Sequence, residues 1–174
     1  SIPWSSIGTS NFRSVVFSPQ YSGAIQTNSL RGGTASGNNT ITITTGVELI
    51  SNVGKYYLEG ISSQANLNDT YIALVYVLPV DFSIWSENAI QIEYKTGSAL
   101  PSYNHVDIYI YKSGAGNVIV SSENNVNTSW STINISSNSL GNWLAGDILE
   151  MYIKMESRTN YYVRVGKITF CYGV

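Results

Sequence analysis

Apolar side chains recur at every second residue in several long segments, and this period of two constrains the fold more than any other feature of the sequence. Residues 90–95 read IQIEYK, and residues 149–156 read LEMYIKME. Successive side chains of a strand point to opposite faces, whereas an amphipathic helix repeats its apolar residues at i, i+3 and i+4. Both segments are therefore predicted to be half-buried strands, each with one face toward a core.

Runs of β-branched and aromatic residues follow one another along the chain and are separated by clusters of Gly, Asn, Ser and Pro. This spacing is typical of a sandwich or barrel, and no segment has a convincing helical pattern. The sequence predicts an all-β protein, a jelly-roll-like antiparallel β-sandwich. The expected strands are residues 12–17, 40–44, 54–60, 70–78, 88–96, 105–112, 117–122, 130–136, 147–156 and 162–172.

The chain has 174 residues, which suits one domain with one core. Residues 1–46 lack regular alternation, and the segment from Ser29 to Asn39 is rich in Gly, Ser and Asn, which are typical of loops. We expect residues 1–46 to form an irregular arm or a wrapping strand that reaches a neighbouring subunit, and residues 47–174 to form the sandwich. Because the chain begins with Ser1 and not with Met, we also expect a processed or excised piece.

Residues 71–78 read YIALVYVL and are apolar at both parities. In an antiparallel protein, the outer face of such a strand has to be covered by another element or another subunit. This pattern favours oligomerisation, with Tyr71, Leu74 and Tyr76 as candidate interface residues.

The apolar residues of the last strand change parity between Val165 and Ile168. An extra residue near Gly166 would keep both groups of apolar side chains on the core side, so we predict a β-bulge there. The alternative is a strand that is buried on both faces.

Charged residues make up 11% of the chain, against about 25% in an average soluble protein. Uncharged polar groups then supply the solubility, which suits virion or extracellular proteins that pack against identical subunits or sugars. A net charge of -2 does not attract phosphates, so we expect no nucleic-acid binding. Cys171, the only cysteine, lies in an apolar run and is predicted to be a buried small hydrophobe. No apolar stretch reaches the ~18 residues that span a bilayer, so we expect no membrane insertion.

The side chains that carry common chemistries are scarce. His105 is the only histidine, and its pairing with Asp107 on one strand face is predicted to be a solvated edge. One histidine and one cysteine do not supply the usual ligands of zinc or iron. Two Asn-rich loops, residues 66–69 and 124–127, carry oxygen ligands for calcium, but we favour turns there. We therefore expect no enzyme activity, no cofactor and no metal.

Aromatic side chains are the remaining candidates for binding. Tyr109 and Tyr111 have the opposite parity to the apolar residues around them, so they are expected to stand in a row on the outer face of a sheet. Trp85, Trp130 and Trp143 lie in or beside loops, where indole rings could stack on sugars. The alternative for each tryptophan is that it closes one end of the core.

The sequence contains the segments LPVDFSIWSENAI (78–90), WLAGDIL (143–149) and VGKITF (165–170). These segments resemble the C-terminal domains of phage structural proteins such as head fibres, capsid decoration proteins and tail-associated proteins. The resemblance covers about residues 70–172 and carries no catalytic residue. It implies a jelly-roll sandwich on a virion surface, assembled as a homotrimer.

Two hypotheses for function follow. The leading one is a virion structural or accessory protein that self-assembles, contacts other virion proteins and binds surfaces, including a host-surface glycan. The alternative is a carbohydrate-binding module or lectin-like adhesin in which the tyrosine row and the loop tryptophans form the platform. A third idea, polysaccharide cleavage, lacks a recognisable carboxylate pair.

Overall fold

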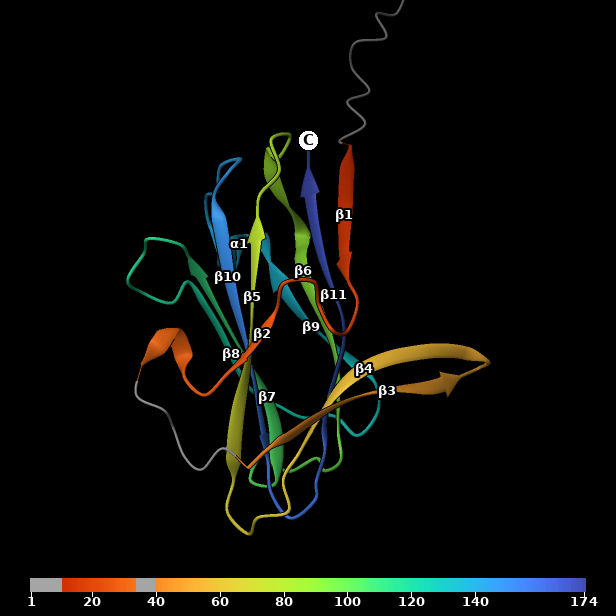
Figure 1. Ribbon diagram of the computed structural model, residues 1–174. Coiled ribbons are helices and arrows are strands. Elements are labelled where there is room, and N and C mark those ends of the chain that lie inside the picture. Colours follow the sequence, from red (N-terminus) through yellow and green to blue (C-terminus); the bar gives the residue numbers. More distant parts are fainter. Residues whose placement is uncertain (1–10, 34–39) are drawn as a thin grey trace, which may run out of the picture.

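Antiparallel strands in two facing sheets make up nearly all of the regular structure in the computed structural model, which describes residues 11–33 and 40–174 (Figure 1). The first sheet contains β1 (Phe12–Phe17), β3 (Thr42–Ile50), β4 (Val53–Ile61), β6 (Ile84–Thr96), β9 (Ser131–Ser136) and β11 (Val163–Gly173). The second contains β2 (Ile25–Thr27), β5 (Asn68–Val77), β7 (Asn104–Lys112), β8 (Val120–Asn125) and β10 (Ile148–Ser157). The predicted all-β sandwich is confirmed.

The strand order is β3-β4-β11-β6-β9 in the first sheet, where β1 also pairs with β11, and β2-β5-β10-β7-β8 in the second. Helical structure among the described residues is limited to α1 (Ser137–Leu140) and a 3-10 turn at Leu30–Gly32. No helix in this part of the chain has the length and apolar character needed to cross a membrane.

The period of two places the core between the sheets. In β10, the alternate residues Leu149, Met151, Ile153 and Met155 are fully buried, whereas Glu150 lies on the outer face. Neighbouring strands repeat this arrangement, so that the inward side chains of both sheets form one core cluster. The alternation read from residues 149–156 is thereby confirmed.

A β-bulge interrupts β11 at the predicted place. The register with β6 shifts between Val165 and Ile168, and both side chains stay buried. The hydroxyl of Tyr21, a fully buried side chain, donates a hydrogen bond to the carbonyl oxygen of Gly166 at 2.6 Å. Tyr21 thus satisfies a backbone acceptor that the bulge removes from the ladder.

The described part of the predicted arm wraps around the sandwich. β1 joins the first sheet through β11, and β2 joins the second through β5. The boundary expected at residue 46 falls inside β3, and residues 1–10 and 34–39 lie outside the described residues. Cys171 is half-buried on the outer side of β11, opposite Ser14 of β1, and not fully buried as expected.

The two faces of β5 differ in how they are covered. Leu74 and Tyr76 point into the core, so their assignment to a subunit interface is wrong. Tyr71 lies on the outer face and is also buried. Farther along this face, Val75 and Val77 are 56% and 55% exposed. The apolar outer face is therefore covered only in its first half.

Tryptophans close one end of the core. Trp85 and Trp143 are buried, with their rings in an edge contact 6.1 Å apart, and Trp143 Nε1 donates to the Leu140 carbonyl at 2.8 Å. Asp147 caps the turn before β10 by accepting from the Leu144 N–H at 2.8 Å. Neither indole forms a surface platform, which corrects the expectation that they bind a ligand.

The β3–β4 hairpin extends beyond the sandwich, and Figure 1 shows it projecting to one side. β4 pairs with β11 only over Leu58–Gly60, and the rest of the hairpin lies past that contact. Val47 and Leu49 lie on the face of β3 that packs against the core near the start of the strand. At their positions the hairpin has left the sandwich, so no core side chains lie beside them. They are therefore exposed, Leu49 at 73%.

Candidate functional site

A groove lies between the β3–β4 hairpin and the turn that follows β1. Its larger hollow has a volume of about 380 Å³ and is mostly apolar. A second hollow of about 210 Å³ adjoins it. Tyr56 and Pro19 line both hollows. Concave, mostly apolar sites with a few polar groups are where small ligands bind most often.

Tyr56 is the most exposed aromatic side chain of the groove, at 66%. It lies directly opposite Val47 in the hairpin register, on the part of β4 that has left the sandwich. Its neighbour Tyr57 points to the other side, where its ring lies against Gly46, so close that a Cβ at that glycine would stand 2.5 Å from it. The hairpin therefore exposes the Tyr56 ring to solvent and packs the Tyr57 ring against Gly46.

Charged side chains form the other wall of the larger hollow. Lys55 Nζ lies 2.8 Å from Glu93 Oε2, and Lys167 Nζ lies 3.6 Å from Glu93 Oε1. The Lys55 ammonium also stands 4.9 Å from the centre of the Trp130 ring. Hydrogen-bond donors and acceptors in fixed positions thus flank the exposed ring of Tyr56.

Glu48 ties the hairpin to the outer face of the first sheet. Its carboxylate accepts from Lys95 at 2.9 Å and from Trp130 Nε1 at 3.1 Å, and it lies 3.2 Å from Arg164. The hydrogen bond from Lys95 is the main reason that the pKa of Glu48 lies below its usual value. These contacts fix the orientation of Lys55 and Tyr56 relative to the sandwich.

The predicted tyrosine row does lie on the outer face of the second sheet, but it is partly covered. Tyr111 is buried, with the Arg31 guanidinium 4.4 Å above its ring, and Tyr152 contacts it edge-on. Tyr109 is half-buried, and its hydroxyl donates to Glu123 at 2.8 Å. The free platform expected at Tyr111 is therefore wrong, because a side chain from the region before β3 closes over it.

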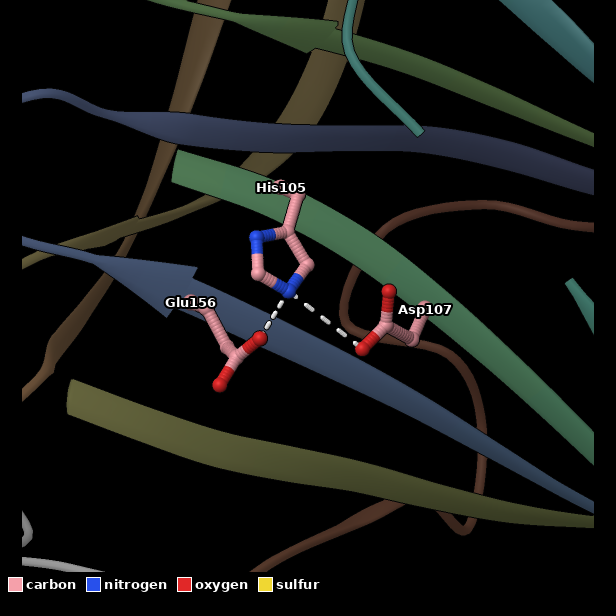
Figure 2. Close-up of side chains that lie close together, drawn as sticks. All are labelled: His105, Asp107 and Glu156. Carbon is pink, nitrogen blue, oxygen red and sulfur yellow. Dashed lines mark ion pairs between the residues drawn. The ribbon is translucent and has the colours of Figure 1, made fainter. Parts of the chain in front are cut away.

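A charged cluster lies farther down the same face. Figure 2 shows His105 and Asp107 on β7 turned toward Glu156 on β10. His105 and Asp107 are 6% and 4% exposed, so the solvated edge expected from sequence is wrong. Burial raises the pKa of the Asp107 carboxyl and that of the Glu156 carboxyl.

The structure separates the five aromatic residues predicted to bind. Trp85 and Trp143 are in the core and Tyr111 is covered, whereas Trp130 lies beside the groove and Tyr109 stays half-exposed. Binding by these last two remains a prediction. Sequence reasoning missed Tyr56. The consecutive aromatic residues at 56 and 57 were the available signal, since adjacent residues of a strand cannot both face a core.

Searches against protein families and against curated proteins gave no match. Solved structures do match in fold. The glycoside hydrolase domain of Endo-D from Streptococcus pneumoniae R6 has a TM-score of 0.46 and 14% identity, over 84% of this chain and 21% of that one. The enzymatically active domain of tailspike protein 4 from bacteriophage CBA120 has a TM-score of 0.45 and 9% identity, over 92% and 19%.

The carbohydrate-binding module TmCBM61, solved with β-1,4-galactotriose, has a TM-score of 0.40 and 12% identity, over 92% of this chain and 88% of that one. The chain thus spans about a fifth of the hydrolase and tailspike chains (21% and 19%) and most of the binding module. At these identities, the likeness concerns the fold. A phage tailspike domain and carbohydrate-binding modules are among the solved structures that resemble this chain in fold.

Two of these similar chains are described as enzymatic domains. The expectation that this chain is not an enzyme, which rested on the scarcity of catalytic side chains, is corrected by this finding. This chain resembles parts of chains that are described as enzymatic domains, so the exclusion is not retained.

Proposed function

We propose that this chain is a surface-binding β-sandwich module that recognises carbohydrate in the groove around Tyr56. The observation that carries the proposal is an exposed aromatic ring between two hollows, with a Lys–Glu pair beside it. Sugars present flat apolar C–H faces and a rim of hydroxyl groups. An aromatic face and fixed charged hydrogen-bond partners are the side chains that match this pattern.

The module belongs, in this proposal, to a virion surface or to another extracellular setting. The support is the low charge of the chain, the resemblance of residues 70–172 to phage structural proteins, and a fold similar to that of a tailspike domain and of sugar-binding modules. Host-surface glycans are then the expected ligands.

A glycan array with the full chain tests the proposal, followed by titration of the best ligand against Tyr56 variants. Tyr56→Ala removes the stacking ring and is expected to weaken binding roughly tenfold, equivalent to about 1.4 kcal/mol. Tyr56→Phe keeps the ring and should bind nearly as well as the parent chain. The control is Phe12→Ala, which removes an aromatic side chain 56% exposed on β1.

Two results would contradict the proposal. One is a blank array at high protein concentration. The other is binding that Tyr56→Ala and Phe12→Ala leave equally intact.

Self-association is a second candidate function, and a separate observation favours it. Val47 and Leu49 lie side by side on the exposed face of the hairpin, beyond the sandwich core. Contiguous exposed apolar residues mark interaction surfaces in soluble proteins. We infer that a second copy of the chain, and in a virion a threefold assembly, covers this face in place of a glycan, because Tyr56 lies opposite Val47 on the same face.

A further inference from the structure

His105, Asp107 and Glu156 bring one nitrogen and two oxygen atoms together on the outer face of the second sheet (Figure 2). His105 and Asp107 are alternate residues of β7, so their side chains point to the same face, and Glu156 lies opposite His105 in the register with β10. His105 Nε2 contacts the Glu156 carboxylate and lies 3.5 Å from Asp107 Oδ2. The three donor atoms all lie within 4.8 Å of one another.

The second ring nitrogen of His105 determines what the first can do. Nδ1 lies 2.8 Å from the carbonyl oxygen of Pro101. A carbonyl oxygen only accepts, so Nδ1 carries the hydrogen, and a neutral imidazole then presents a lone pair at Nε2. That lone pair points at two carboxylate oxygens, which are acceptors as well. Three electron-rich atoms converge in this way around a positive occupant, which is either a metal ion or a proton on Nε2.

Each of the three side chains is also held from outside the cluster. Besides the contact of His105 with Pro101, Asp107 Oδ1 accepts from the backbone N–H of Asn124 at 2.7 Å. Glu156 Oε1 lies 3.1 Å from Lys154 Nζ. In metal sites, such outer contacts fix the orientation of the ligands and leave the other nitrogen or oxygen turned toward the ion. This cluster has the same arrangement at all three positions.

Charge and burial favour a cation over a vacant centre. The Lys154 ammonium lies 3.1 Å from Glu156, so the two carboxylates of the cluster face one ammonium group when His105 is neutral. Buried charges that lack a partner are strongly destabilising. A cation at the centre of the cluster would balance the negative charge that remains.

We propose that His105, Asp107 and Glu156 bind a divalent transition-metal ion, with Zn²⁺ as its representative. An imidazole nitrogen with two carboxylate oxygens suits Zn²⁺ and its neighbours in the first row, whereas Ca²⁺ and Mg²⁺ take oxygen ligands. At metal–ligand distances of about 2.0–2.2 Å, the ion joins β7 to β10 across the middle of the second sheet. The site is independent of the groove at Tyr56, which lies on the other sheet.

Metal content and thermal stability of the full chain test the site. After incubation with Zn²⁺ and gel filtration, elemental analysis is expected to give one Zn²⁺ per chain. Zn²⁺ at about 100 times its Kd is expected to raise the Tm by about 5–10 °C, and a chelator should reverse the rise. Ca²⁺ should leave the Tm unchanged.

Variants distinguish this site from adventitious surface binding. Asp107→Asn keeps an acceptor for the Asn124 N–H but removes the charge, and it is expected to lower Zn²⁺ affinity at least tenfold. Glu156→Gln should act in the same way. The matched control is Glu150→Gln, on the same face of the same strand but outside the cluster, which should keep one Zn²⁺ per chain.

Because His105 is the only histidine, the imidazole nitrogen signals in an NMR spectrum report on this site alone. Zn²⁺ should shift the Nε2 signal and leave Nδ1 protonated. The proposal is overturned if the parent chain retains no Zn²⁺, if Asp107→Asn binds it as tightly as the parent, or if both ring nitrogens carry a proton at pH 7 with Zn²⁺ present. In the last case, the positive occupant is the proton.

Discussion

Two buried tyrosines, Tyr21 and Tyr76, differ in what their hydroxyl groups contact. The Tyr21 hydroxyl satisfies the Gly166 carbonyl at the bulge of β11, at 2.6 Å. The Tyr76 hydroxyl is buried and has no hydrogen-bond partner among the described residues. Burial raises the pKa of Tyr76 to about 12, because the ionised form would lose its hydration there. The same chemical group is therefore stabilising at one position and costly at the other.

Removing each hydroxyl tests this difference. Tyr21→Phe leaves a buried carbonyl unsatisfied and is expected to lower the free energy of unfolding by about 1–3 kcal/mol. Tyr76→Phe removes an unpaired polar group and should leave the stability unchanged or slightly higher. Urea unfolding of both variants beside the parent chain gives the comparison. Equal losses in the two variants would contradict the hydrogen-bond assignment.

The sequence could show which side of a strand a residue occupies, but not what covers that side. The parity of Tyr109 and Tyr111 placed both on an outer face correctly. The Arg31 guanidinium then covers Tyr111 from a point eighty residues earlier in the chain, and no local pattern predicts that contact. His105 shows the same limit, because its burial depends on Glu156 in a neighbouring strand.

At the scale of elements, the β3–β4 hairpin depends on Glu48 for its attachment to the first sheet. Lys95, Arg164 and Trp130 all direct polar hydrogens at this carboxylate. The pKa of Glu48 is lowered from 4.5, so the folded state favours its charged form more than the unfolded chain does. The stabilisation that the Glu48 carboxylate contributes is complete above about pH 4.5, the pKa in the unfolded chain, and is lost as the pH falls through the lowered pKa of the folded state.

Glu48→Gln removes the pH-dependent part of this attachment. The variant is expected to be less stable than the parent at pH 7, and the difference between the two should shrink toward pH 3 as Glu48 of the parent becomes protonated. Urea midpoints at both pH values check this. Amide exchange in residues 46–57 should also quicken in the variant at pH 7, because the hairpin opens more readily.

Glu87→Gln is the control for the loss of one negative charge, since Glu87 is exposed near the start of β6. It should behave as the parent does at both pH values. A Glu48→Gln chain that keeps full stability and slow exchange at pH 7 would show that the hairpin is held by other contacts.

The existence of most strands followed from the sequence, whereas some of their lengths did not. The strand expected at residues 40–44 continues to Ile50, through Gly46. Gly46 lies beyond the expected end of this strand, and in the structure it leaves room for the Tyr57 ring. This close approach lengthens the hairpin, and with it creates the groove that the sequence did not reveal.

At the scale of the whole molecule, the uncovered hairpin face bears on assembly. Leu49→Glu places a charge where a second copy would pack, and it is expected to turn the proposed homotrimer into a monomer with unchanged stability, because Leu49 makes no part of the core. Sedimentation equilibrium at high protein concentration gives the mass of each form. A parent chain that stays monomeric would remove the support for self-association.

The two-sheet architecture was accessible from the period of two, but the order of strands was not, because β11 lies between β4 and β6 through contacts distant in sequence. The sequence supported the exclusion of a metal site and of an active site less well than it supported the fold. Counting histidines and cysteines ruled out a metal and an active site, yet the sheet brings one histidine together with two carboxylates. The composition shows which residues are available for a site, whereas the strand order and register determine which of them lie close together.

Amide chemical-shift mapping with the strongest glycan from an array shows whether the groove around Tyr56 binds carbohydrate. We expect the shifted signals to gather at Tyr56, Lys55 and Lys167 as glycan is added, and Tyr56→Ala to require roughly ten times more glycan for the shifts that remain. Shifts that gather instead around Tyr109 and Tyr152, or that occur nowhere, would contradict binding in the groove.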